Sequence, residues 1–260
     1  MIDAVEGLST PWLIVVVLGG TCVMTAAIYF GVMRVAAGPH GAALKGLSPG
    51  MLPPMGLVFG LIVGFLVAGL WGDLGDARDA VNREASALRS AELVVAATFP
   101  GAPTSRIDAL VQRHIRDAAT KEWPAMADQR ATLTVVPAPL AQALALALSL
   151  HPAGPAQATG QRELVSSLEN ALDARRQRII VSRSSVNWVK WLAVVTLAVL
   201  TLAAIACVHS DNRGSAALAM SLFAGAVAIT LVLIASQARP FSGEFGITPD
   251  VLLQVQSARS

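Results

Sequence analysis

The chain has 260 residues, of which 54% are hydrophobic and 14% are charged, and its mean hydropathy is +0.60. This composition is typical of an integral membrane protein with a modest soluble part, and a formal net charge of only +2 excludes a strongly basic nucleic-acid-binding surface. The two cysteines, Cys22 and Cys207, fall inside apolar segments, so we expect buried thiols rather than a disulfide or a metal pair.

The first membrane span is predicted from about Trp12 to Met33. The residues before it are acidic and include no lysine or arginine, unlike a secretory signal peptide, so we expect the span to remain in the mature protein. Residues 3–9 are expected to form a short entry helix. A loop rich in glycine and proline is predicted from Arg34 to Pro54.

One long helix is predicted from Met55 to Leu93. It begins as a second apolar span, Met55 to Trp71, and then becomes charged without a helix breaker. We therefore expect a single helix that leaves the bilayer and continues its packing in water.

The second span has small residues at every fourth position, which form one ridge at the helical period. This small-residue ridge consists of Gly56, Gly60, Gly64, Ala68 and Gly72. Such spacing lets the backbones of two helices approach closely in lipid, so the ridge predicts packing against another helix rather than a pore lining.

The opposite face of the second span carries larger apolar side chains, namely Val58, Ile62, Leu66 and Leu70. In a homo-oligomer such as a pentamer, with roughly five copies around an axis, this row would form an apolar neck of the kind that gates by dewetting. The alternative is an ordinary lipid-facing or core face.

The residues between the second and third spans, 72–187, are predicted to form a helical domain. One helix is expected to be capped by Thr104 or Ser105, and Pro137 and Pro139 are expected to open an apolar helix too short to cross a bilayer. A last helix is predicted from Gln161 to Ser185 and could run straight into the third span.

The third and fourth spans are predicted at about Trp188–Val208 and Ser215–Ser236, joined by a tight turn. The sequence therefore predicts an all-α integral membrane protein with four transmembrane helices and a helical cytoplasmic domain between spans two and three. Its segments are the N-terminal part with the first two spans at 1–71, the helical domain at 72–187, the hairpin of spans three and four at 188–236, and the tail at 237–260.

Arginine and lysine are concentrated on the side of the membrane that holds the helical domain. The positive-inside rule makes that side cytoplasmic, and four spans place both termini there as well. Four arginines before the third span are expected to contact anionic lipid, or to attract anions to a cytoplasmic mouth. They are Arg175, Arg176, Arg178 and Arg183.

Acidic residues follow the second span and would form a ring in an oligomer. They are Asp73, Asp76, Asp79 and Glu84. Carboxylate oxygens suit calcium, but the spacing matches no loop motif and arginines are interleaved, so we expect a solvated, partly paired face and no metal site. No motif for a catalytic nucleophile or for phosphate binding occurs, so we expect neither an enzyme nor a cofactor.

Several stretches resemble a known family. They are Gly60–Trp71 followed by Val81–Ala87, the step Lys121-Glu122-Trp123-Pro124, the basic stretch Leu172–Arg178, and the ending Arg239-Pro240-Phe241-Ser242-Gly243 with Thr248-Pro249. Over about Gly56 to Leu253 the chain is similar to the bacterial bestrophin-like family, a membrane family of unknown function. Ala238 stands where that family usually has aspartate.

The resemblance implies four spans with a helical cytoplasmic part in the bacterial inner membrane. By analogy it also implies a homo-oligomeric channel for small anions, with the second span near the axis. The alternative is a non-catalytic accessory or scaffold subunit of a larger membrane complex. The expected partners are the lipid bilayer and further copies of the chain, with other membrane subunits under the alternative.

Overall fold

Every regular element of the described chain is a helix, which confirms the all-α class. The computed structural model describes residues 10–39, 44, 47–184, 187–243 and 246–257, so the entry helix predicted at residues 3–9 lies outside the described residues. Contacts within the chain divide it into two units. The membrane unit is Met1–Gly72 with Ser185–Ala238, and the helical unit is Asp73–Ser184 with Arg239–Ser260.

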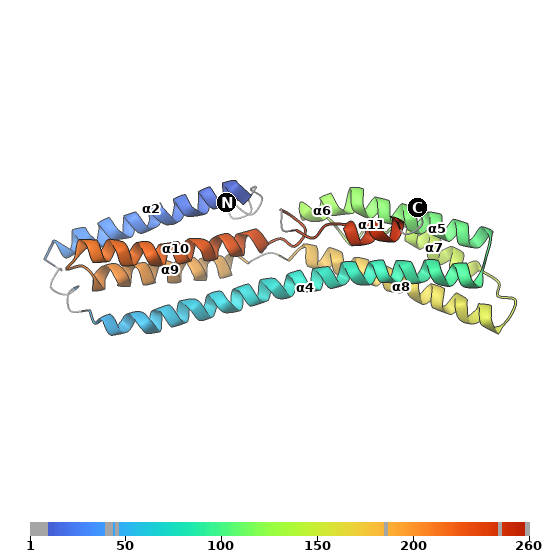
Figure 1. The fold of residues 1–260 in the computed structure, drawn as a ribbon, viewed down its shortest axis with the longest axis horizontal. Helices are drawn as coiled ribbons and strands as arrows, with labels where there is room; N and C mark the ends of the chain where they lie inside the picture. Colours follow the sequence, from blue (N-terminus) through green and yellow to red (C-terminus); the bar gives the residue numbers. More distant parts are fainter. Residues whose placement is uncertain (1–9, 40–43, 45–46, 185–186, 244–245, 258–260) are drawn as a thin grey trace. The chain divides into compact units, whose positions relative to one another are not determined.

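The membrane unit contains the four helices that are long and apolar enough to cross a membrane, as predicted. They are α2 (Thr10–Ala36), the apolar part of α4 (Leu52–Thr98), α9 (Trp188–Val208) and α10 (Arg213–Gln237), shown in Figure 1. Large apolar side chains such as Trp12, Phe30 and Leu222 are exposed on them. Lipid is as apolar as these side chains, so their exposure is expected of an integral membrane protein.

Within the membrane unit, α2 lies against α9 and α10, and these two contact each other. The apolar part of α4 joins them through Phe59, Leu66 and Leu70, which cluster with Val194 of α9 and Val227 of α10. One face of α4 is therefore covered by helices of the same chain.

The long helix predicted from Met55 to Leu93 is present as α4, which is longer at both ends. A 3₁₀ turn, Pro49–Met51, precedes it, and Pro53 and Pro54 lie inside its first turn. The predicted loop from Arg34 to Pro54 is thus shorter than expected. The physical reason is that a proline at the start of a helix lacks only an N–H that would have had no partner there.

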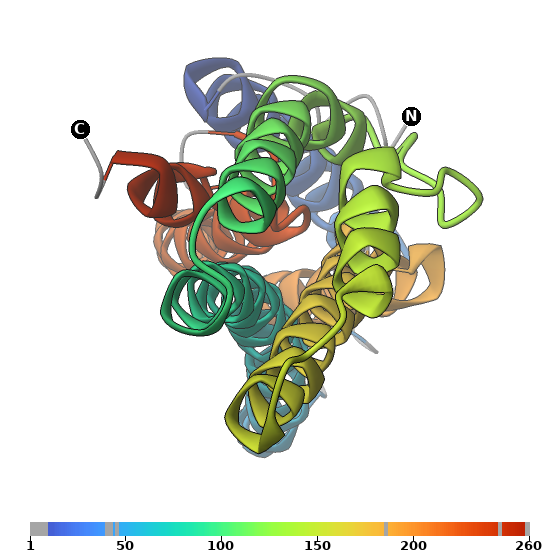
Figure 2. The same cartoon turned by 90° about the vertical axis from the view of Figure 1, so that its right-hand side faces the viewer.

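The helical unit is built from the charged part of α4 and the remaining helices (Figures 1 and 2). These are α5 (Ala102–Asp117), the π-helix η2 (Ala118–Glu122), α6 (Trp123–Ala127), α7 (Ala138–Ser149), α8 (Pro155–Ser182) and α11 (Asp250–Ser257). They enclose one apolar core, to which Leu88, Ile115, Leu140 and Leu168 contribute fully buried side chains.

Two helix ends differ from the prediction. The cap of α5 is Gly101, while the Thr104 hydroxyl donates to the Phe99 carbonyl at 2.6 Å, so the predicted capping box is wrong. Helix α8 begins at Pro155 rather than Gln161, and it ends at Ser182 instead of running into the third span. Proline at a first helical position explains the early start.

Helix α8 approaches the end of α4 very closely at Gly160. A Cβ atom added at Gly160 would lie 2.3 Å from the γ-carbon of Thr98, closer than real atoms come. The absence of a side chain at this position is therefore what permits the packing of α8 on α4.

Candidate functional site

The face of α4 that the membrane unit leaves uncovered carries the small-residue ridge. A Cβ atom added at Gly56, Gly60, Gly64 or Gly72 would meet no heavy atom within 4 Å. Leu57, Leu61 and Phe65 project from the same side of the helix and are 72%, 55% and 71% exposed. No other part of the described chain covers this face, so it can face lipid, a second chain or the central axis of an oligomer.

The apolar row predicted as a neck is divided between the covered and the open sides of α4. Leu66 and Leu70 are 7% and 6% exposed and pack in the cluster with α9 and α10. Ile62 is half-buried against the same cluster, whereas Val58 remains exposed. Because helices of the same chain cover Leu66 and Leu70, these two residues do not form an open wall, and their assignment to a neck is corrected.

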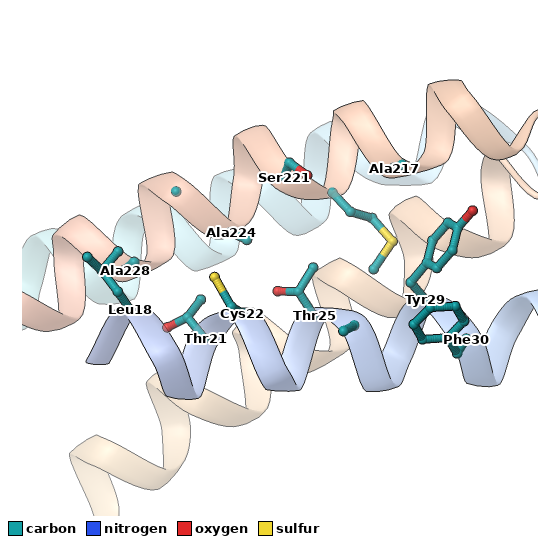
Figure 3. A pocket seen from close by; sticks show the side chains of 13 residues that line it. Leu18, Thr21, Cys22, Thr25, Tyr29, Phe30, Ala217, Ser221, Ala224 and Ala228 are labelled. Atoms are coloured by element: carbon teal, nitrogen blue, oxygen red, sulfur yellow. The ribbon is translucent and has the colours of Figure 1, made fainter. Parts of the chain in front are cut away.

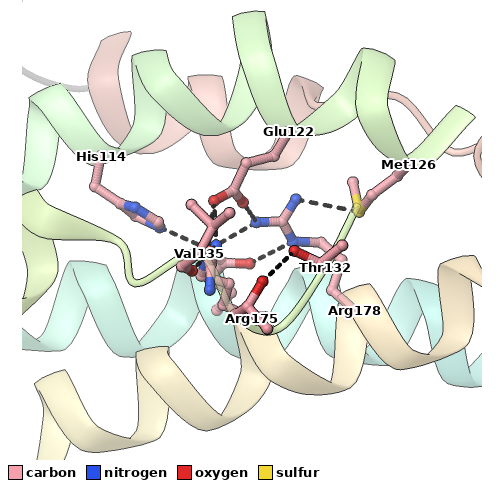
Figure 4. A network of polar contacts seen from close by, with 9 residues as sticks. His114, Glu122, Met126, Thr132, Val135, Arg175 and Arg178 are labelled. Carbon is pink, nitrogen blue, oxygen red and sulfur yellow. Dashed lines mark hydrogen bonds and ion pairs between the residues drawn. The ribbon is translucent and has the colours of Figure 1, made fainter. Parts of the chain in front are cut away.

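A network of buried charges occupies the centre of the helical unit (Figure 4). Glu84 of α4 accepts hydrogen bonds from Nε and Nη2 of Arg178 of α8, at 2.7 and 3.2 Å. His114 of α5 lies on the other side of this carboxylate, with Nε2 at 2.8 Å from Oε1. A carboxylate can only accept, so Nε2 carries the proton of this hydrogen bond. All three side chains are buried.

Glu122 extends the network to a second arginine. Its carboxylate accepts from Arg178 Nη2 at 2.8 Å and from Arg175 Nε at 2.8 Å, and Arg175 also donates to the Val135 carbonyl at 3.2 Å. Glu122 is the last residue of the π-helix η2. A π-turn adds a residue to the helical repeat and so re-aims the side chains that follow, here toward Arg178.

The residue after Glu122 connects the network to the C-terminal segment. The guanidinium of Arg178 lies 4.6 Å from the ring centroid of Trp123, and Trp123 Nε1 donates to the Ile247 carbonyl at 2.8 Å. The Phe241 ring packs edge-on against Trp123 at a centroid distance of 5.7 Å. The Ile247 amide in turn donates to the Pro240 carbonyl, which closes the loop after the Arg-Pro-Phe-Ser-Gly stretch.

The buried charges stabilise one another. Burial alone would raise the pKa of Glu84, but the charge of Arg178 and the hydrogen bond and charge of His114 outweigh it, so the pKa lies below its ordinary value. Burial would likewise lower the pKa of Arg178, and the two carboxylates hold it above its ordinary value. Glu84 and Arg178 therefore stay ionised at neutral pH, and the network joins α4, α5, η2 and α8.

The four arginines predicted at a mouth have different environments. Arg175 and Arg178 are buried in the network, so they are not available to attract anions. Arg176 is exposed and pairs with Asp173, and the exposed Arg183 donates to the Ala131 carbonyl at 3.1 Å.

Glu84 was predicted to belong to an acidic ring, but its side chain faces the core of the helical unit. The other three acidic residues are nearer the surface: Asp76 and Asp79 are exposed and Asp73 is half-buried. Among the described residues, no group of three or more His, Cys, Asp or Glu side chains could hold a metal ion. Both cysteines are free, and Cys22 is exposed rather than buried as expected.

We did not predict this network from the sequence, although the sequence places two of its charged residues on otherwise apolar helix faces. Glu84 lies among the small and apolar residues Ala77, Ala80 and Leu88, which share its buried helix face. Arg178 similarly follows Ala171 and Ala174 on the buried side of α8. A charged residue within such a face predicts a charge partner on another helix, but periodicity does not name that partner.

The comparisons with known proteins agree with this architecture. Residues 19–252 match the bestrophin-like domain family, so the chain belongs to the bestrophin-like family. No curated protein matches the chain.

Solved structures with a similar fold include a bacterial bestrophin homologue from Klebsiella pneumoniae. It has a TM-score of 0.70 at 10% identity, over 94% of this chain and 96% of that chain. A single-residue variant of that homologue has a TM-score of 0.68 at 11% identity, over 94% and 97%. A variant described as a membrane protein has a TM-score of 0.68 at 12% identity, over 94% and 96%. At these identities the similarity shows a shared fold.

Proposed function

We propose that this bestrophin-like chain assembles into a homo-oligomeric ring that conducts small anions, with the apolar part of α4 near the ring axis. The observation that supports this most directly is the uncovered face of α4, which combines the small-residue ridge with the exposed Leu61 and Phe65. A helix that is packed on one face and bare on the other is suited to a position between its own chain and a shared axis.

The two parts of the open face have different roles in this proposal. The ridge around Gly60 and Gly64 packs against the neighbouring copy, because small residues allow close helix approach in lipid. The flank with Val58, Leu61 and Phe65, at positions i, i+3 and i+7, lies on one side of the helix and forms the apolar neck. Val58 is retained from the row predicted from the sequence, whereas Leu61 and Phe65 replace Leu66 and Leu70.

The anion preference is proposed from exposed arginines together with the family. Arg78, Arg83 and Arg89 are exposed on the charged part of α4, and Arg176 and Arg183 are exposed on and after α8. In a ring these charges would be repeated in every copy and would concentrate anions near a mouth. Near the span ends, arginine and lysine are also more numerous on the side of the helical unit than on the opposite side, which has Arg34, Lys45 and Arg213; this supports a cytoplasmic helical unit with both termini on that side of a bacterial inner membrane.

The test is chloride flux into liposomes that contain the purified protein. Phe65→Ala and Leu61→Ala should raise the flux, because a wider apolar neck wets more easily. Leu222→Ala, which truncates an exposed leucine of α10 outside the proposed neck, is the matched control and should leave the flux unchanged. If the folded, oriented wild-type protein and both neck variants give no flux above that of empty liposomes, the channel proposal is wrong.

A second candidate function is an accessory or scaffold subunit of a larger membrane complex. It is favoured by an apolar groove in the helical unit, where Leu133, Val135, Val136 and Leu148 are 50–69% exposed. Clustered exposed apolar side chains on a water-facing domain are typical of protein contacts. A detergent-solubilised particle that contains only this chain argues against this function, and stoichiometric co-purification of other subunits supports it.

A further inference from the structure

A pocket of about 410 Å³ lies between α2 and α10 in the membrane unit. It exists because α10 presents small residues to α2, including Ala217, Ala224, Gly225 and Ala228. Figure 3 shows Thr21, Cys22 and Thr25 directed from α2 toward this side of α10. None of the described residues that line the pocket carries a charge at neutral pH.

One lining residue has a hydrogen-bonding group without a partner in the described chain. The Thr25 hydroxyl oxygen is buried and makes no hydrogen bond, whereas the Thr21 hydroxyl, one turn away on α2, donates to the Val17 carbonyl at 2.8 Å. An unpaired hydroxyl in an apolar environment is unfavourable, and a threonine in a membrane helix ordinarily donates to the carbonyl four residues earlier. Among the described residues that line the pocket, the Thr25 hydroxyl is the buried polar group that lacks a partner.

The same end of the pocket lies next to the backbone of an arginine, Arg213. Tyr29, one turn beyond Thr25, lines the pocket, and its hydroxyl donates to the Arg213 carbonyl at 3.4 Å. Arg213 is exposed and is the first residue of α10. From this end inward, the pocket begins at Tyr29, next to the first residue of α10; Thr25 follows one helical turn, or about 6 Å, further along α2, and an apolar groove lies beyond it.

We infer that this pocket binds an anionic glycerophospholipid. Its phosphate lies near Arg213, an ester carbonyl accepts from the Thr25 hydroxyl, and one acyl chain lies along Leu18, Ala224 and Ala228. A helix of a second copy would also cover the groove, but its backbone carbonyls are already used within the helix. A lipid ester brings an unpaired acceptor, which matches the unpaired donor.

Native mass spectrometry of the detergent-solubilised protein with added phosphatidylglycerol tests this assignment. Gly225→Leu should abolish binding at this site, because a Cβ at Gly225 meets no atom within 4 Å and the leucine would fill the pocket without a clash. Ala226→Leu, on the exposed neighbouring position outside the pocket, should bind as the wild type does. Thr25→Val should weaken binding about threefold or more, as expected for one lost hydrogen bond.

The headgroup is tested separately. Arg213→Gln should weaken phosphatidylglycerol binding by about tenfold, with little effect on zwitterionic phosphatidylcholine. Glycerol 3-phosphate, which has the phosphate but no acyl chain, should not bind. Equal binding by wild type, Gly225→Leu and Thr25→Val would overturn the assignment, and a lipid-independent loss of oligomer in Gly225→Leu but not in Ala226→Leu would assign the groove to a second copy.

A second measurement uses the wild-type pocket and does not depend on these variants. Cys22 lines the groove and is exposed, so N-ethylmaleimide should alkylate it in a Cys207→Ala background. Phosphatidylglycerol should slow this alkylation, whereas glycerol 3-phosphate should not. An unchanged alkylation rate at saturating lipid would show that the groove is empty.

Discussion

Glu84 on α4 and Arg178 on α8 form a doubly hydrogen-bonded ion pair across 94 residues of sequence, and both side chains are 0% exposed. Taking two charges out of water is costly, and the pair is tolerated because each charge has further partners. Glu84 also contacts His114, and Arg178 also contacts Glu122 and the face of Trp123. The net stabilisation from such a buried pair is small. Removing one partner is nevertheless costly, because the other charge then stays buried without its counter-charge.

Removal of one partner should therefore destabilise the protein strongly. Glu84→Ala leaves the Arg178 guanidinium buried without its main counter-charge, and the expected loss is about 3–5 kcal/mol of unfolding free energy. Denaturation of the purified protein in detergent measures this loss. Asp173→Asn, which removes a carboxylate from the exposed pair with Arg176, is the control and should cost less than about 1 kcal/mol.

The double variant Glu84→Gln with Arg178→Met distinguishes a charge effect from a packing effect. If the single substitutions are costly because they leave a buried charge, replacing both charged groups should restore part of the stability. Additive losses in the two single variants and the double variant would contradict this account.

Acidification should weaken the helical unit through Glu84. Its folded-state pKa lies below the ordinary value of 4.5, so its ionised form contributes stability that is fully present above about pH 4.5. That contribution is lost as the pH falls from 4.5 through the lowered pKa. The thermal midpoint of the wild type should drop across this window more steeply than that of Glu84→Gln, which has no carboxyl at this position. Parallel curves for the two proteins would show that Glu84 does not carry the effect.

Gly160 should not tolerate a side chain. Gly160→Ala would place a methyl group against the Thr98 side chain at distances of 2.3–2.9 Å, so α8 or Thr98 must move. Overpacking of this kind costs about 1–3 kcal/mol. Gly154→Ala is the matched control, because a Cβ there meets nothing within 4 Å. A double variant with Thr98→Gly should recover stability if the clash is the cause.

The Arg-Pro-Phe-Ser-Gly ending should act as a structural clasp of the helical unit. Phe241 is 5% exposed and packs against Trp123, so Phe241→Ala should cost about 3 kcal/mol or more by leaving a cavity. Trp123→Phe should cost less, since it keeps a ring but removes the hydrogen bond to the Ile247 carbonyl. Unchanged melting curves for both variants would show that the ending is held loosely.

The spans were predictable because their signal is local. The third span was predicted at the bounds the structure gives for α9, and Met55 to Leu93 was predicted as one helix, since an apolar run of sufficient length specifies a membrane helix. Errors occurred at helix ends, where prolines at Pro53 and Pro155 begin helices instead of interrupting loops.

The network could not be predicted because its signal is not local. Glu122 meets Arg178 only through a π-turn, and a single inserted residue changes which side chains face the core. Which face of α4 is covered within the chain could not be predicted for a related reason. The sequence shows two opposite faces, but which one α9 and α10 cover depends on the path of the chain between them.

The small-residue ridge should not tolerate a large side chain if it forms a contact between copies of the chain. Gly64→Leu causes no clash within one chain, because a Cβ there meets nothing within 4 Å, so the chain should insert and fold normally. If a neighbouring copy packs on the ridge, the leucine separates the two backbones and removes the close contacts that drive association in lipid. The oligomer seen by native gel or mass photometry should then be lost. Gly19→Leu, on an equally open position of α2, should assemble as the wild type does. Normal assembly of Gly64→Leu would place the ridge against lipid or an open lumen, and the contact between copies would have to lie elsewhere.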